Sequence, residues 1–327
     1  MKSAVFAACV GSAVLAPCAQ AATSGLTRSF VSSYGSDSND CSRQAPCRSF
    51  ATAITKTAAG GEINTLDPGG YGPVTITKAI SIVSGLGEAG ILVPAAGTGI
   101  TINAGPDDEI NLRGLAIEGA GVGGTGIRFN TGGALTVTNS VIRNLTDAGM
   151  DLEPTGASTF TITDTLVSDT ARVGIYFYPQ GSNGAARATL LRVTASRNQW
   201  GVYANGNAVP APPSTGNPGV RLSISDSTIA HNIKGDGYGV YANGLSYSDQ
   251  FFFYTTTAIT LGNTLITGNK YGVVISAGSL TMNGVRIENV VTAFTRCIAG
   301  KPYSFSSYGN NAFARSSDCS LTNFSLQ

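Results

Sequence analysis

Tyrosine and asparagine side chains recur at matching places in this 327-residue chain, and such a set could bind a sugar chain. The hexapeptide GVYANG occurs twice, at 201–206 and 239–244. Aromatic rings pack on the C–H faces of sugars, while amides and carboxylates hydrogen-bond to sugar hydroxyls. Six segments share the wider pattern of Gly, aliphatic, variable, apolar, variable, and they begin at Gly126, Gly149, Gly174, Gly201, Gly239 and Gly272.

Two files of outward side chains follow if these segments lie above one another, because alternate residues of a strand point to opposite sides. The third positions read Arg128, Asp151, Tyr176, Tyr203, Tyr241 and Val274. The fifth positions read Asn130, Glu153, Tyr178, Asn205, Asn243 and Ser276. We predict a carbohydrate-binding face made of Tyr176, Tyr178, Tyr203, Asn205, Tyr241, Asn243, Asp151 and Glu153. The alternative is that the tyrosines stack on one another as a ladder that only stabilises the protein.

Four further residues are candidates for catalysis: Asp169, Arg197, His231 and Lys270. The first three are expected at equivalent corners of successive repeats, where a base and a carboxylate could meet an acidic sugar. The alternative is that these four residues are polar side chains exposed to solvent at turns and have no catalytic role. No complete catalytic motif supports them, since a single histidine excludes an HExxH zinc site and the chain has no GxSxG. The sequence predicts no metal site.

Charge and hydropathy exclude other partners. The 20 Lys and Arg residues nearly balance 19 Asp and Glu residues, and no basic run occurs, so nucleic-acid binding is not expected. No segment reaches the length that spans a bilayer, so no membrane span is expected either. Oligomeric state cannot be predicted from these residues.

The first 21 residues resemble a secretory signal peptide. Lys2 precedes an apolar stretch, and the segment ends in the Ala-x-Ala pattern at Ala21. We therefore expect an exported protein, periplasmic or extracellular. Cleavage would leave four cysteines, for which we predict local disulfides, Cys41 with Cys47 and Cys297 with Cys319, although other pairings and a zinc site remain alternatives.

The repeats themselves predict the fold. Strands this short cannot bury one face alone, but stacked about 4.8 Å apart they hydrogen-bond to one another and enclose an apolar interior. We expect an all-β, single-stranded parallel β-helix of roughly nine coils over residues 62–294. Residues 22–61 would supply a capping helix with an apolar stripe, and residues 295–327 a C-terminal cap. Leucine-rich repeats are the structural alternative, but their leucine consensus is absent.

These repeats, with the opening Phe30 to Asp40 and Ala45 to Ile54, resemble the right-handed parallel β-helix superfamily typified by pectate lyases, in particular exported β-helix repeat proteins of bacterial type. The resemblance implies a right-handed coil and a polysaccharide or cell-surface glycan as partner. It also raises calcium as a possible cofactor, although no cofactor is expected from the residues. Because the superfamily includes non-enzymes, we expect an exported polysaccharide-binding protein or scaffold. The alternative is a polysaccharide lyase or glycoside hydrolase with an atypical site.

Overall fold

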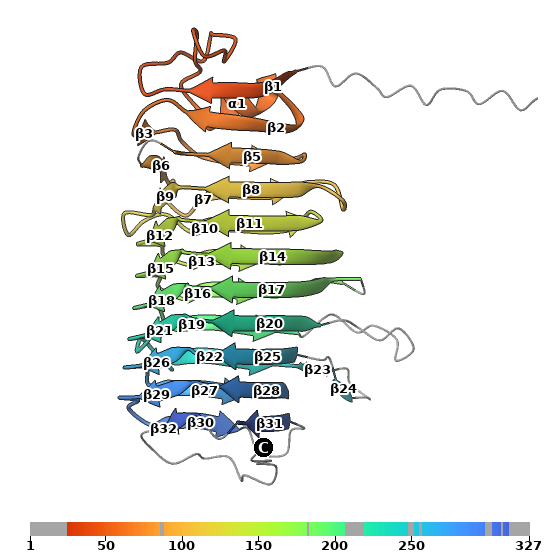
Figure 1. Ribbon diagram of the computed structural model, residues 1–327, viewed down its shortest axis with the longest axis vertical. Coiled ribbons are helices and arrows are strands. Elements are labelled where there is room, and N and C mark those ends of the chain that lie inside the picture. The colour runs from red at the N-terminus through yellow and green to blue at the C-terminus, as the bar shows by residue number, and fades with distance from the viewer. Residues whose placement is uncertain are drawn as a thin grey trace, which may run out of the picture.

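Three parallel sheets run along a single stack of coils (Figure 1). The computed structural model describes residues 25–85, 88–181, 183–206, 219–247, 252–254, 257–297, 303–308 and 310–313. Each coil contributes one strand to sheet A, one to sheet B and one to sheet C, in that order along the chain. The predicted fold, a single-stranded right-handed parallel β-helix, is confirmed.

Within the described residues, sheet A has eleven strands, sheet B ten and sheet C nine. Sheet A contains β1 (Leu26–Val31), β2 (Thr57–Thr65), β5 (Ile80–Val83), β8 (Glu109–Arg113), β11 (Ala134–Thr138), β14 (Ala157–Thr163), β17 (Ala185–Leu191), β20 (Val220–Ser225), β25 (Thr257–Gly262), β28 (Gly278–Asn283) and β31 (Tyr303–Ser307). Sheet B contains β3 (Gly69–Gly70), β6 (Ala89–Leu92), β9 (Leu115–Glu118), β12 (Val141–Arg143), β15 (Leu166–Ser168), β18 (Thr194–Ser196), β21 (Thr228–Ala230), β26 (Leu265–Thr267), β29 (Arg286–Glu288) and β32 (Ala312–Phe313). Sheet C contains β4 (Val74–Ile76), β7 (Thr98–Asn103), β10 (Thr125–Thr131), β13 (Ala148–Leu152), β16 (Val173–Phe177), β19 (Trp200–Asn205), β22 (Tyr238–Asn243), β27 (Tyr271–Ile275) and β30 (Ala293–Cys297). A separate antiparallel hairpin joins β23 (Leu245–Tyr247) to β24 (Phe252–Tyr254).

The six glycine-led segments fall in register on six successive strands of sheet C. Their second residues pair Cα to Cα, and all of them are fully buried in the interior: Ile127, Met150, Ile175, Val202, Val240 and Val273. The leading glycines are needed for space, because a Cβ on Gly201 would lie 2.6 Å from the carbonyl oxygen of Gly239. The same clash recurs at Gly174 and at Gly239. The leading glycine therefore recurs because each coil meets the next through a contact that only glycine permits.

The N-terminal end is closed by helix α1 (Phe50–Lys56), as predicted. Ser49 caps the helix by accepting a hydrogen bond from the backbone N–H of Thr52, and Phe50, Ala53 and Ile54 bury the predicted apolar stripe. Cys41 and Cys47 form the predicted disulfide. The segment 22–61 does more than cap, because β1 and the start of β2 already belong to sheet A.

Strands also continue past residue 294, where the predicted β-helix ended. In this C-terminal part β30, β31 and β32 each add to one of the three sheets. The residues predicted to form a C-terminal cap therefore begin as further strands of the same stack. The predicted Cys297–Cys319 disulfide and the signal peptide lie outside the residues and side chains that the structure describes.

Candidate functional site

The predicted file of third positions exists on the outer face of sheet C. Arg128 pairs with Asp151, Asp151 with Tyr176, Tyr176 with Tyr203, and Tyr203 with Tyr241. Tyr176 and Tyr203 belong to a hydrophobic cluster separate from the interior core, which confirms that they point outward. Periodicity in the sequence thus corresponds to superposition in space.

The central tyrosines of this file form a ladder and not a flat open face. The rings of Tyr176 and Tyr203 stack with centroids 4.9 Å apart, and those of Tyr203 and Tyr241 stack at 4.6 Å. Tyr176 and Tyr203 are each only 8% exposed. These two rings are therefore almost closed to solvent, because each ring covers the face of the next.

Asparagines of the fifth-position file hold the tyrosine hydroxyls. The amide of Asn205 donates to the hydroxyl of Tyr176 at 3.0 Å, and the amide of Asn243 donates to the hydroxyl of Tyr203 at 3.4 Å. Asn205 is buried as well. Burial raises the pKa of Tyr176 to about 12, so its phenol remains protonated at neutral pH. The asparagines therefore fix the ladder, and their part in carbohydrate binding stays a prediction.

A second aromatic file lies beside the first and was missed in the sequence. Trp200 pairs with Tyr238, and Tyr238 pairs with Tyr271, each at the position just before a leading glycine. Their spacing was visible as an aromatic residue ahead of three successive glycine motifs. Rings of the two files touch, for instance Trp200 edge-on to Tyr203 at 5.1 Å. We call the combined surface the aromatic patch, made of Tyr176, Tyr178, Trp200, Tyr203, Tyr238, Tyr241 and Tyr271.

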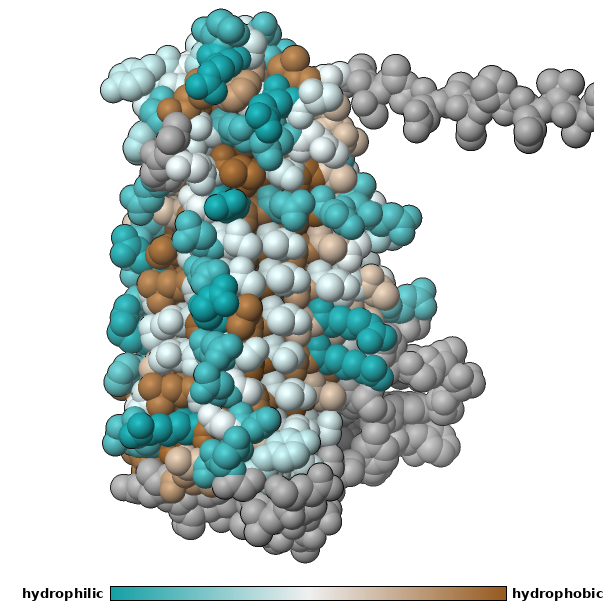
Figure 2. Space-filling view, in the orientation of Figure 1, coloured by the Kyte–Doolittle hydropathy of each residue, from teal (hydrophilic) through white to brown (hydrophobic). Residues whose placement is uncertain are grey.

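The aromatic patch distinguishes sheet C from the other two sheets. Five of its rings are partly exposed: Tyr178, Trp200, Tyr238, Tyr241 and Tyr271. Among the described residues from β5 to β29, the outer faces of sheets A and B carry no aromatic side chain. Figure 2, which views sheet A from outside, shows mostly pale residues of near-neutral hydropathy across that sheet.

A charged cluster borders the aromatic patch on its N-terminal side. It consists of Arg128, Asp147, Asp151, Glu153 and Arg172. Arg128 contacts Asp151 at 2.8 Å and Glu153 at 3.8 Å, while Arg172 pairs with Asp147 and lies over the ring of Tyr176. The predicted residues Asp151 and Glu153 are therefore beside the tyrosines, but both are already engaged by Arg128.

Asp151 is an unusual member of this cluster because it is 1% exposed. Its Oδ2 contacts Arg128, whereas its buried Oδ1 has no hydrogen-bond partner among the described residues. Burial, and secondarily the nearby charge of Glu153, raises the pKa of Asp151 to about 6. Part of the Asp151 population therefore carries a proton near neutral pH.

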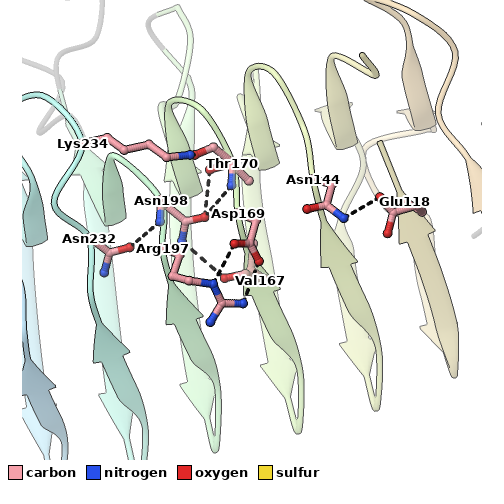
Figure 3. Close-up of polar contacts among 9 residues, drawn as sticks. All are labelled: Glu118, Asn144, Val167, Asp169, Thr170, Arg197, Asn198, Asn232 and Lys234. Atoms are coloured by element: carbon pink, nitrogen blue, oxygen red, sulfur yellow. Dashed lines mark hydrogen bonds and ion pairs between the residues drawn. The ribbon is translucent and has the colours of Figure 1, made fainter. Parts of the chain in front are cut away.

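The four catalytic candidates lie on the corner between sheets B and C. Figure 3 shows two of them, Asp169 and Arg197. Asp169, Arg197 and His231 occupy equivalent positions of successive coils, all in the left-handed conformation with φ of 59°, 57° and 56°. Arg197 binds Asp169 through two hydrogen bonds of 2.7 Å, and this bonding lowers the pKa of Asp169. Lys270 instead donates to the carbonyl oxygen of Gly235. The paired Asp169 and Arg197 thus fit the alternative of a solvated structural corner, and a catalytic role stays untested.

Next to that corner the structure contains a buried asparagine ladder. The backbone N–H of Asn198 donates to Oδ1 of Asn232, and that of Asn232 donates to Oδ1 of Asn269, each at 2.9 Å. Thr170 continues the ladder by donating to Asn198 (Figure 3). All four residues are fully buried. Side-chain oxygens here satisfy backbone donors where the chain turns, so this feature is structural.

In the described part of the chain, no group of three His, Cys, Asp or Glu side chains is placed to hold a metal ion. The carboxylates of the charged cluster face arginines, which does not fit a calcium site. Across the same residues, no helix has the length and apolar character needed to cross a membrane.

The fold is that of the pectate-lyase-like parallel β-helix proteins. Pectate lyase Pel9A aligns with a TM-score of 0.57 and 16% identity, covering 90% of this chain and 78% of its own. A rhamnogalacturonan lyase aligns with a TM-score of 0.52 and 12% identity, covering 91% of this chain and 84% of its own. At these identities the likeness concerns the fold alone. No protein-family model and no curated protein sequence matches the chain.

Proposed function

We propose that this chain is an exported protein that binds a polysaccharide along the outer face of sheet C. One observation carries the proposal: seven aromatic residues from four successive coils gather on the outer face of sheet C, whereas among the described residues from β5 to β29 the outer faces of sheets A and B carry none. Sugars pack on aromatic surfaces and complete their hydrogen bonds with neighbouring polar groups. The partly exposed rings would supply the aromatic surface on which sugars pack. The charged cluster would supply the polar groups for hydrogen bonds.

We expect binding to depend on Trp200 more than on any other residue of the aromatic patch. It is partly exposed and touches Tyr203, Tyr238 and Tyr241. Its Nε1 is buried and has no hydrogen-bond partner among the described residues, so the exposed part of Trp200 that a ligand can meet is its ring. Trp200 would thus offer a ring surface to a sugar.

Two further observations support the class of ligand and the compartment. The similar solved structures are named as lyases of pectate and of rhamnogalacturonan, which favours polysaccharide as the ligand. The Cys41–Cys47 disulfide favours export, since disulfides persist mainly in oxidising compartments. The predicted signal peptide at residues 1–21 agrees with this proposal.

A glycan array that includes pectate and rhamnogalacturonan tests the proposal. We expect saturable binding to at least one polysaccharide, with or without a calcium chelator. Trp200→Ala should weaken that binding at least about tenfold, which corresponds to about 1.4 kcal/mol. Thr260→Ala, an exposed change on the outer face of sheet A, is the control and should bind like the wild type. Circular dichroism checks that both variants fold. Equal binding by the two variants would refute the assignment to the aromatic patch.

Asp151 favours a second candidate function, that of a lyase or glycoside hydrolase with an atypical site. A carboxyl group with a pKa of about 6 is suited to proton transfer near neutral pH, and it lies one coil from Tyr176. The bound polysaccharide is incubated with the protein, and new reducing ends and unsaturated ends are measured. Turnover that disappears in Asp151→Asn would favour the enzyme, whereas binding without turnover favours the binding protein.

A further inference from the structure

A groove of about 420 Å³ lies where α1 meets the outer face of the first strands of sheet C. One wall is the exposed side of α1, with Ala51 and Thr55. The other wall comes from β4 and β7, with Thr75 and Thr101. The groove thus opens on the same sheet that bears the aromatic patch, near the N-terminal end of the stack.

The groove lies in line with the row of third-position residues on the outer face of sheet C. Thr75 pairs with Thr101, Thr101 pairs with Arg128, and Arg128 leads through Asp151 to Tyr176. Strands about 4.8 Å apart place Thr75 about 19 Å from Tyr176 along the stack. A sugar chain lying on the aromatic patch and following this file would therefore reach the groove after crossing the charged cluster.

The face ends at the groove. β4 is the terminal strand of sheet C in the described chain, and α1 stands beside it. A polysaccharide cannot continue along the sheet past this wall without leaving the surface. Five threonines line the groove beside apolar Ala51, Ile54 and Pro73, and this mixture of hydroxyl and apolar groups suits a sugar ring. The volume lies within the range of ordinary small-ligand sites.

We propose that this groove receives the terminal sugar residues of the polysaccharide, so that the protein recognises chain ends in preference to internal stretches. The inference rests on the proposed binding along sheet C and adds to it where the chain stops. The aromatic patch would hold the body of the chain, and α1 would block its further passage.

The experiment fills the groove. Thr75→Phe places a ring in it from an exposed, outward position of a strand, where an aromatic residue is well tolerated. Ala51→Tyr does so from the opposite wall and serves if Thr75→Phe fails to fold. Thr260→Phe makes the same exchange as Thr75→Phe on the outer face of sheet A and is the control.

The probes are oligosaccharides of galacturonan and of rhamnogalacturonan, each with free ends, blocked at one end, or blocked at the other. We expect the wild type and Thr260→Phe to bind free-ended oligosaccharides at least about tenfold more tightly than those blocked at one of the two ends. The groove-filled variant should lose this preference and bind both forms at the weaker level. Blocking that has no effect at either end, or a groove-filled variant that keeps the preference, would overturn the inference.

The two proposals fail in different ways. If neither probe binds the wild type, both proposals fail. If the wild type binds and Trp200→Ala abolishes binding while end-blocking changes nothing, binding along sheet C stands and only chain-end recognition is refuted. Unchanged binding by Trp200→Ala together with a lost end preference in Thr75→Phe would keep the groove and refute the aromatic patch.

Discussion

Replacing Asp151 with asparagine should stabilise the protein at neutral pH although it removes an ion pair. Asp151 is buried, one of its oxygens has no partner among the described residues, and only Arg128 contacts the other. Taking a carboxylate out of water costs more than such incomplete pairing returns. Asparagine keeps the shape of the protonated acid without the charge.

The magnitude follows from the pKa of Asp151, which burial raises from 3.8 to about 6. Each pKa unit corresponds to about 1.4 kcal/mol, so the ionised native state is disfavoured by up to about 3 kcal/mol. The sign follows from proton binding: between about pH 4 and pH 6 the native protein holds this proton more tightly than the unfolded chain. The stability that this tighter proton binding gives the native protein is therefore fully present below pH 4 and is lost as the pH rises through about 6.

Urea unfolding of the wild type and Asp151→Asn over pH 4 to 8 measures the effect. The two proteins should have similar free energies of unfolding near pH 4, and the variant should be more stable by up to about 3 kcal/mol at pH 7. Groups that face Asp151, namely Arg128, Arg172, Asp147, Glu153 and Tyr176, are common to both proteins.

Asp164→Asn is the control, because Asp164 is exposed and its hydrogen bonds to Arg192 lower its pKa. Its carboxylate is already ionised above pH 5 in both states, so its substitution should add no pH dependence there. A constant difference between wild type and Asp151→Asn from pH 4 to pH 8 would refute the argument from burial.

Three further changes test the fold. Gly201→Ala should destabilise the stack by several kcal/mol, since its Cβ would lie 2.6 Å from the carbonyl oxygen of Gly239, whereas Gly156→Ala has open space and should be nearly neutral in thermal unfolding. Asn232→Ala should cost about 2–4 kcal/mol in urea unfolding, because it removes the acceptor of the buried N–H of Asn198 and the amide that donates to the carbonyl of Ala195; a loss below 1 kcal/mol would contradict the ladder. Arg197→Ala should change the free energy of unfolding by no more than about 1 kcal/mol and by less in high salt, and a larger loss would show that the exposed Asp169 pair matters more than expected.

The stacking of coils could be predicted from the sequence because its cause is local. Each leading glycine contacts the leading glycine of the next coil, so the motif recurs wherever coils touch. The alternation of a strand then fixed which residues point outward, and the file from Arg128 to Tyr241 followed correctly. Lengths between the motifs did not matter, since insertions leave the strands and do not change their register.

Burial on the outer face could not be predicted in the same way. A residue on this face is covered mainly by its neighbours on the coils above and below, which lie more than 20 residues away in sequence. Tyr176 is buried because Tyr203 stacks on it and Arg172 lies over its ring. Asparagine posed a second difficulty, since it suits both a left-handed corner and a buried ladder. Asn144 takes the first role and Asn232 the second, one position further along its coil.

The two interpretations of the tyrosines, a stabilising ladder or a ligand surface, are compatible once both aromatic files are considered. Tyr176 and Tyr203 are buried and their hydroxyls are held by asparagines, so they are rigid. Trp200 and Tyr241 pack against Tyr203 and remain partly exposed. A ligand that meets pre-ordered rings loses less side-chain entropy on binding than one that must order them. The ladder would therefore contribute to affinity without touching the sugar, by fixing the rings that do.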